Sequence, residues 1–249
     1  MVYENICKLV LAVSLLVLAV TYHFKDKLPK PREYGAPLTA PHQSPTLRSP
    51  FFITENNQQY TIKPKFDYEL TGVVMTYSDA AGFTNIWHHR RWKDFINVRD
   101  LCVIWGDNVR TGVYKNMHFS SDSWTCWVSW NDRETGRIFQ SNALSNNHLL
   151  TNNNAIKSQM VQAEKGDVVY IKGVLVDYSN QATGGSRKTS ISRDDDGNGA
   201  CETIYVDEFK ILKKANTLWR HLFKLAKWTA LASFMGCMIF FLKTPFKPR

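Results

Sequence analysis

The sequence predicts a mostly β domain flanked by N- and C-terminal transmembrane helices. Both ends of the chain carry apolar runs, Leu9 to Phe24 and Trp228 to Leu242. Between them, short stretches alternate apolar and polar residues, as half-buried strands do. Two of these stretches, ELTGVVM and YIKGVLV, have a central Gly, which marks a bend or bulge in a strand. Bent strands with one helix favour a small OB-like barrel, with a β-sandwich as the alternative.

The two apolar ends approach the roughly 20 residues that a membrane-spanning helix needs. Residues 1–24 are predicted to be an N-terminal anchor, and residues 228–249 a C-terminal transmembrane helix with a basic tail. A cleaved signal peptide is the alternative for the first run, but bulky and charged residues follow it where small ones would be needed. A buried core helix is the alternative for the second, which is apolar on all sides.

The remaining chain divides into three parts. Residues 25–50 hold six of the nine prolines and are predicted to form an extended spacer. Residues 51–213 form the predicted β-rich globular domain. Residues 214–227 are predicted to be a basic amphipathic juxtamembrane helix.

Within the β-rich domain, residues 50–64 read as a hairpin with a polar turn, and one helix is expected within 146–163, capped by Asn residues. Residues 85–100 fit either a helix or a loop. The remaining strand-like segments are 66–77, 101–106, 123–130, 167–179, 189–193 and 200–212.

The segment SRDDDGNGACE, residues 192–202, resembles half of a calcium-binding EF-hand loop, with Asp194 at its first position. The twelfth position of that loop is Tyr205, where a bidentate Glu is needed. Strand-like segments flank it, and Asp-Gly and Asn-Gly are strong turn signals. We therefore predict a turn from Asp194 to Gly199 that joins antiparallel strands, with a weak cation site as the alternative.

Residues 87–92, WHHRRW, are the densest group of candidate binding side chains. His88 and His89 could contribute to a metal site, and Arg90 and Arg91 could bind a phosphate or carboxylate. A solvated basic loop is the alternative. Because no complete metal-binding, nucleotide-binding or catalytic signature is present, we expect no metal and no cofactor.

Two further residues are candidates for ligand binding. Trp127 falls on the polar face of its predicted strand, so it either meets a second layer or binds a ligand. His148 lies in LSNNHLL, where an Asn/His catalytic pair competes with a purely structural role for the polar residues.

The charge distribution argues against nucleic-acid binding. Residues 51–209 carry a net charge of −3, whereas residues 210–249 carry +9. A nucleic-acid binder needs its basic residues on the binding domain. Here they lie beside the predicted spans, where anionic lipids are the expected partners.

Five segments together resemble an uncharacterised family of bacterial membrane-anchored proteins: RDLCVIWGDNV, FSSDSWTCW, LSNNHLL, GDVVYIKGVLVDYS and RDDDGNGACETIYVDEF. The resemblance covers roughly residues 50–214. It implies an extracytoplasmic β domain but no particular activity.

We therefore expect a membrane-tethered, non-enzymatic binding or scaffold module, a subunit of a complex with other membrane proteins. The alternative is a membrane-anchored hydrolase that uses His and Asp residues of the β domain. The expected location is the bacterial inner membrane, with two spans and a periplasmic domain. Lys and Arg counts near the spans favour the opposite orientation, but long domains translocate largely regardless of charge. In an oxidising compartment, three domain cysteines can form one disulfide and leave one free thiol.

Overall fold

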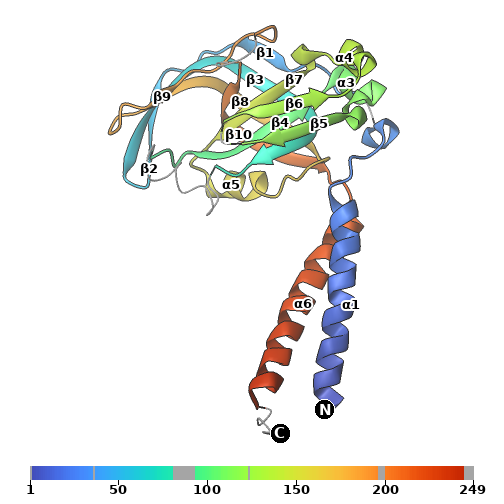
Figure 1. Cartoon of the computed structure of the whole chain (residues 1–249). Coiled ribbons are helices and arrows are strands. Elements are labelled where there is room, and N and C mark those ends of the chain that lie inside the picture. The colour runs from blue at the N-terminus through green and yellow to red at the C-terminus, as the bar shows by residue number, and fades with distance from the viewer. Residues whose placement is uncertain (1, 36, 81–92, 123, 196–199, 244–249) are drawn as a thin grey trace. The chain divides into compact units, whose positions relative to one another are not determined.

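The computed structural model describes residues 2–35, 37–80, 93–122, 124–195 and 200–243. The chain divides into a helical unit, Met1–Lys27 with Asn216–Arg249, and a β unit, Leu28–Ala215 (Figure 1).

The helical unit consists of α1 (Val2–Lys25) and α6 (Thr217–Lys243), which pack against each other. Both helices are long and apolar enough to cross a membrane. The predicted juxtamembrane helix and second span are parts of the single helix α6. Its buried small residues are spaced three or four apart and therefore share one face: Ala226, Ala230 and Ser233.

The β unit combines ten strands with short helices among the described residues. The strands are β1 (His42–Pro45), β2 (Phe51–Glu55), β3 (Gln58–Ser78), β4 (Asn97–Ile104), β5 (Met117–Ser121), β6 (Cys126–Trp130), β7 (Leu144–Leu150), β8 (Val168–Asn180), β9 (Ser186–Arg187) and β10 (Glu202–Lys213). The helices are η1 (Pro31–Tyr34), α3 (Gly106–Thr111), η2 (Val113–Asn116), α4 (Arg133–Ile138), η3 (Ser141–Ala143) and α5 (Asn154–Met160).

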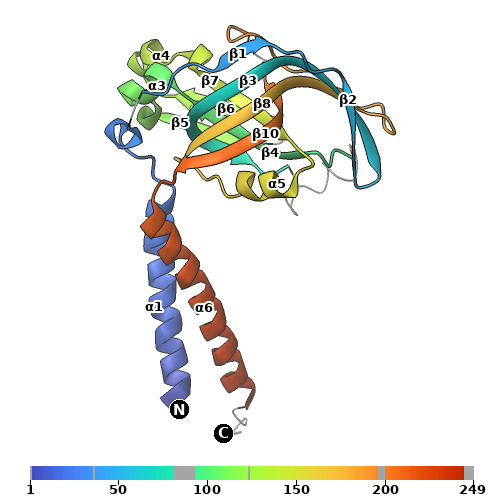
Figure 2. The ribbon, with the colours of Figure 1, turned by 180° about the vertical axis from the view of Figure 1, so that it is seen from behind.

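Eight strands form one mixed sheet in the order β1-β3-β4-β7-β10-β8-β9, with β2 also paired to β3. The β7–β10 pair is parallel, and β3 additionally pairs with β8 (Figure 2). Both central glycines noted in the sequence lie at close approaches of backbones. A Cβ on Gly173 would collide with the carbonyl oxygen of Tyr205, and one on Gly72 with the carbonyl oxygen of Ile104 and the side chain of Val103.

Several predicted elements have different bounds in the structure. The Pro-rich segment 25–50 includes η1 and β1, and β1 pairs with β3, so part of it belongs to the β unit. The Asn-rich segment 144–150 forms β7, and the expected helix starts only at Asn154, after the side chain of Asn153 caps it. Segment 189–193 is not a strand; the short strand β9 precedes it.

The β2–β3 hairpin is confirmed, with Asn56 and Asn57 at positive φ in its turn. Strands β5 and β6 form a separate hairpin, and the disulfide Cys102–Cys126 ties it to β4. This is the expected pattern of one disulfide and one free thiol, Cys201, in the β unit.

Candidate functional site

The centre of the candidate site lies on one face of strands β4 and β7. Asp100 is paired directly with His148, and Cys102 with Asn146. Paired residues on neighbouring strands project to the same face, and residues two apart along a strand share that face. All four side chains therefore lie on one side of the sheet.

Strand β10 extends this face on the other side of β7. It runs parallel to β7 with Glu202 beside Asn147. Continuing the register by one residue places Cys201 beside Asn146. A side-chain contact confirms this placement, because Asn146 Nδ2 lies 3.5 Å from Cys201 Sγ.

Asp100 and His148 form a buried pair, with 2.6 Å between Asp100 Oδ1 and His148 Nδ1. Asn97 Nδ2 also donates to Asp100 Oδ1, at 3.0 Å. Burial opposes the charge of Asp100, but His148, Asn97 and Arg187 together outweigh burial, so the pKa of the carboxyl is lowered. Burial likewise opposes the charge of His148, yet Asp100 raises the pKa of the imidazole. Asp100 thus holds the imidazole through Nδ1 and leaves Nε2 on the side of the ring away from the carboxylate.

Cys201 is the partly exposed member of this group. Burial raises the pKa of its thiol, but interactions with His148 and Asn146 outweigh burial, and the net pKa is lowered. His148 Nε2 is buried and makes no hydrogen bond of regular geometry within the described residues. Such bonds are often long or poorly aligned before substrate binds. Cys201, His148 and Asp100 thus have the arrangement of a nucleophile, a base and a residue that orients the base.

The Cys102–Cys126 disulfide brings the segment before β6 to this face. Trp124 lies two residues before Cys126, and its carbonyl oxygen accepts a hydrogen bond of 2.8 Å from Asn146 Nδ2. The indole ring centroid lies 5.8 Å from that of His148. Trp124 has a φ of +92°, which is strained for a bulky residue. Strain of this kind is concentrated at functional sites.

A pocket of about 750 Å³ opens beside the thiol. Cys201, Asn146, Trp124 and Arg187 line it, together with Trp127. A second pocket of about 540 Å³ shares Trp124 and Arg187 with the first. The Cys201 thiol is therefore accessible to a small molecule, although Asp100 and His148 are buried.

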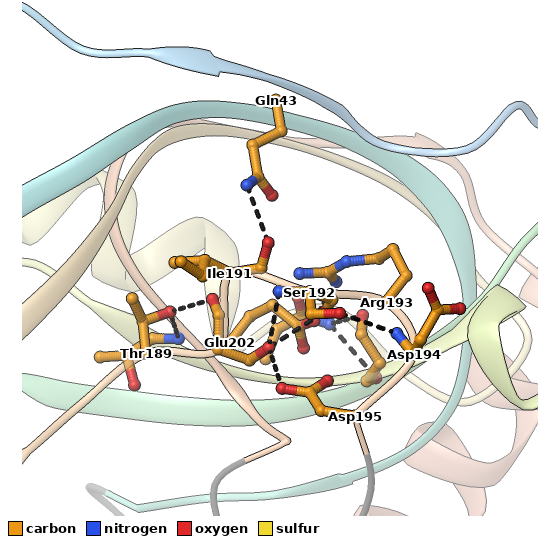
Figure 3. Close-up of polar contacts among 12 residues, drawn as sticks. Gln43, Thr189, Ile191, Ser192, Arg193, Asp194, Asp195 and Glu202 are labelled. Carbon is orange, nitrogen blue, oxygen red and sulfur yellow. Dashed lines mark hydrogen bonds and ion pairs between the residues drawn. The ribbon is translucent and has the colours of Figure 1, made fainter.

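Polar contacts hold the segment before β10 in place (Figure 3). Ser190 N donates to the carbonyl oxygen of Cys201 at 2.9 Å. Thr203 N donates to Thr189 Oγ1 at 3.0 Å, and Arg193 forms an ion pair with the buried Glu202. These contacts fix the backbone on both sides of the thiol. Residues 196–199 lie outside the described residues, so the turn itself stays a prediction, but the expected strand before it is wrong, because residues 189–195 form no strand.

Of the candidate residues predicted from the sequence, the structure describes two, His148 and Trp127. His148 lies at the centre of the site, and Trp127 lines the pocket with its indole Nε1 donating to Asp122 Oδ2. Four predicted residues fall outside the described part of the chain: His88, His89, Arg90 and Arg91.

Sequence reasoning missed Cys201, Asp100 and Arg187. The available signal was that Asp100 directly precedes one strand-like segment and Cys201 lies in another, whereas His148 fell in the range where a helix was expected. The register that aligns them depends on pairings between distant segments. Comparison with protein-family models, curated proteins and solved structures finds no match to this chain.

Proposed function

We propose that the β unit is a cysteine-dependent hydrolase or transferase of acyl groups, anchored to a membrane. The observation that carries the proposal is the convergence of Cys201, His148 and Asp100 beside a pocket. A lowered thiol pKa and a base oriented by a carboxylate are what thiol nucleophiles require. This is the hydrolase alternative from the sequence, with Cys201 added as the nucleophile.

In the proposed reaction, the thiol proton moves to His148 Nε2, and the thiolate sulfur attacks the carbonyl carbon of the acyl substrate. The imidazolium then returns a proton to the leaving group as the carbon–leaving-group bond breaks, which leaves an acyl thioester on Cys201. Water or an acceptor, deprotonated by His148, attacks the thioester and restores the thiol. Asp100 is the positioning residue that holds His148 in the required orientation.

The test uses the full chain in detergent with p-nitrophenyl acetate as the probe. We expect a burst of p-nitrophenolate equal to the protein concentration, and one acetyl group on Cys201 by mass spectrometry. Cys201→Ala should lose both, whereas Cys7→Ala/Cys237→Ala should retain both. Acetylation that persists in Cys201→Ala would contradict the proposal.

We further propose that the sheet closes as an OB-type barrel. The pairing of β3 with both β4 and β8 supports closure. The parallel β7–β10 pair, and the position of α5 between β7 and β8 in the chain, support the OB type.

For location, we propose two spans in a bacterial inner membrane, with the β unit outside the cytoplasm. The Cys102–Cys126 disulfide supports an oxidising compartment. Leu47 is fully exposed and suits a labelling test. In a Cys7→Ala/Cys201→Ala/Cys237→Ala background, Leu47→Cys should react in intact cells with a small, membrane-impermeant maleimide. Labelling only after the inner membrane is broken would reverse the orientation.

A binding or scaffold role is the second candidate, with membrane lipids and other membrane-protein subunits as partners. It is favoured by Trp127 and Trp130, whose side chains are exposed on β6. Trp127→Ala/Trp130→Ala should then lose proteins that co-purify in mild detergent, and Cys201→Ala should keep them. If neither variant changes the co-purifying proteins, this surface has no such role.

A further inference from the structure

The guanidinium of Arg187 lies at the candidate site, and no carboxylate among the described residues forms an ion pair with it. Its Nη1 atom is buried and has no hydrogen-bond partner within the described residues. Among the described residues, no Asp or Glu carboxylate lies within 4.0 Å of the Arg187 guanidinium. Leaving a buried charged donor unpaired is costly, so such a group indicates a ligand that completes it.

The structure also holds Arg187 in a defined position. The central guanidinium carbon lies 4.0 Å from the centroid of the Trp124 ring, a cation–π arrangement. The positive φ of Trp124 and the hydrogen bond from Asn146 to its carbonyl fix that ring beside His148. Arg187 is therefore oriented by the same residues that contact the nucleophile.

The charge of Arg187 acts at the reacting sulfur. It contributes to the lowered pKa of Cys201, after burial and the larger effects of His148 and Asn146. Both residues line the 750 Å³ pocket, and Lys188 adds a second cation to its wall. The carboxylate of Asp195, also in the wall, accepts a hydrogen bond from Ser190 Oγ.

Resting on the proposed function, we propose that Arg187 pairs with a carboxylate of the substrate. The acyl substrates would then be those that carry a carboxylate close to the reacting carbonyl. Arg favours this group because its fork of N–H donors can bind both carboxylate oxygens. The indole of Trp124 gives the carboxylate-bearing portion an apolar wall.

The test compares two alkylating probes that share their leaving group, iodoacetate and iodoacetamide. In each reaction the Cys201 thiolate attacks the methylene carbon, the carbon–sulfur bond forms, and iodide leaves with the electron pair of the carbon–iodine bond. Only iodoacetate carries a carboxylate. The ratio of the two rates, divided by the ratio for free cysteine, therefore measures carboxylate recognition. Any change in the thiol pKa cancels in this ratio.

The full chain is used in detergent with Cys7→Ala/Cys237→Ala, so that Cys201 is the free thiol. We expect Arg187→Gln to lower the ratio about tenfold, the effect of losing a charge-assisted hydrogen bond. Lys188→Gln removes the same charge from the neighbouring pocket residue, which lacks the fork of Arg donors, and should lower the ratio less than Arg187→Gln does. Arg187→Lys should give an intermediate ratio.

An unchanged ratio in Arg187→Gln, or an equal fall in Arg187→Gln and Lys188→Gln, would overturn carboxylate pairing and leave the proposed function intact. In that case the iodoacetamide rate would still report an activated thiol. Failure of both probes to alkylate Cys201 in the parent would instead contradict the proposed function, and this inference with it.

Discussion

Asp100 faces His148 across adjacent antiparallel strands, and the two side chains are joined at 2.6 Å inside the β unit. Asp100 raises the pKa of the buried imidazole, and His148 in turn lowers the pKa of the Cys201 thiol. The pKa of the accessible Cys201 thiol thus depends, through His148, on a carboxylate that is itself buried.

Asp100→Asn should therefore raise the pKa of Cys201. Without the carboxylate, His148 loses its proton at a lower pH and no longer stabilises the thiolate. Below the thiol pKa, each unit of increase lowers the alkylation rate about tenfold. The measurement is the pH profile of iodoacetamide alkylation of Cys201. Asp107→Asn, which alters an exposed ion pair with Arg110, is the matched control. A profile that does not move would contradict the coupling.

The second prediction concerns Glu202, whose pKa is raised to about 7 by burial, against the opposing effect of Arg193. Between its ordinary value of 4.5 and about 7, the folded chain binds more protons than the unfolded chain. Stability should therefore fall as pH rises through this window, by about 3 kcal/mol in total.

Glu202→Gln should remove this dependence, because the amide does not titrate. Urea unfolding of the full chain in detergent, near pH 5 and pH 8, measures the difference. The exposed Glu134→Gln should behave like the parent. Equal pH dependence in the parent and Glu202→Gln would show that Glu202 does not titrate in this range.

The third prediction concerns the disulfide that positions Trp124. Cys102 and Cys126 are 24 residues apart, so reduction should destabilise the β unit by about 3 kcal/mol. Dithiothreitol should lower the urea midpoint of the parent but not that of Cys102→Ala/Cys126→Ala. Because the disulfide holds Trp124 near Asn146, the same double variant should also alkylate more slowly at Cys201. Full reactivity of that variant would argue that the β5–β6 hairpin is not needed for the site.

The fourth prediction concerns the helical unit. A Cβ added to Gly236 would lie 3.9 Å from Cys7 Cβ, within the usual range for a disulfide. Gly236→Cys, in a Cys237→Ala background, should therefore form a disulfide with Cys7 on mild oxidation. Mass spectrometry of the digested protein identifies the linked peptides. Ala232, four residues before Gly236 on α6, is exposed, so Ala232→Cys is the control that should not link. Equal yields would contradict the helix packing.

The sequence by itself determined the elements whose causes are local. The apolar runs at the ends predict α1 and α6 because length and composition decide whether a helix can span a bilayer. Asn56 and Asn57 predict the β2–β3 turn because Asn tolerates positive φ. Tyr205 rules out an EF-hand loop because it stands at the twelfth loop position, where calcium needs a bidentate carboxylate.

Only the tertiary structure decided the site. Asp100, His148 and Cys201 are separated by 48 and 53 residues in the chain. They meet because β7 pairs antiparallel with β4 and parallel with β10. The register of these two pairings places Asp100 beside His148 and Glu202 beside Asn147. A slip of one residue in either pairing would turn a side chain to the opposite face of the sheet. Register depends on packing between distant segments, and no local pattern in the sequence encodes it.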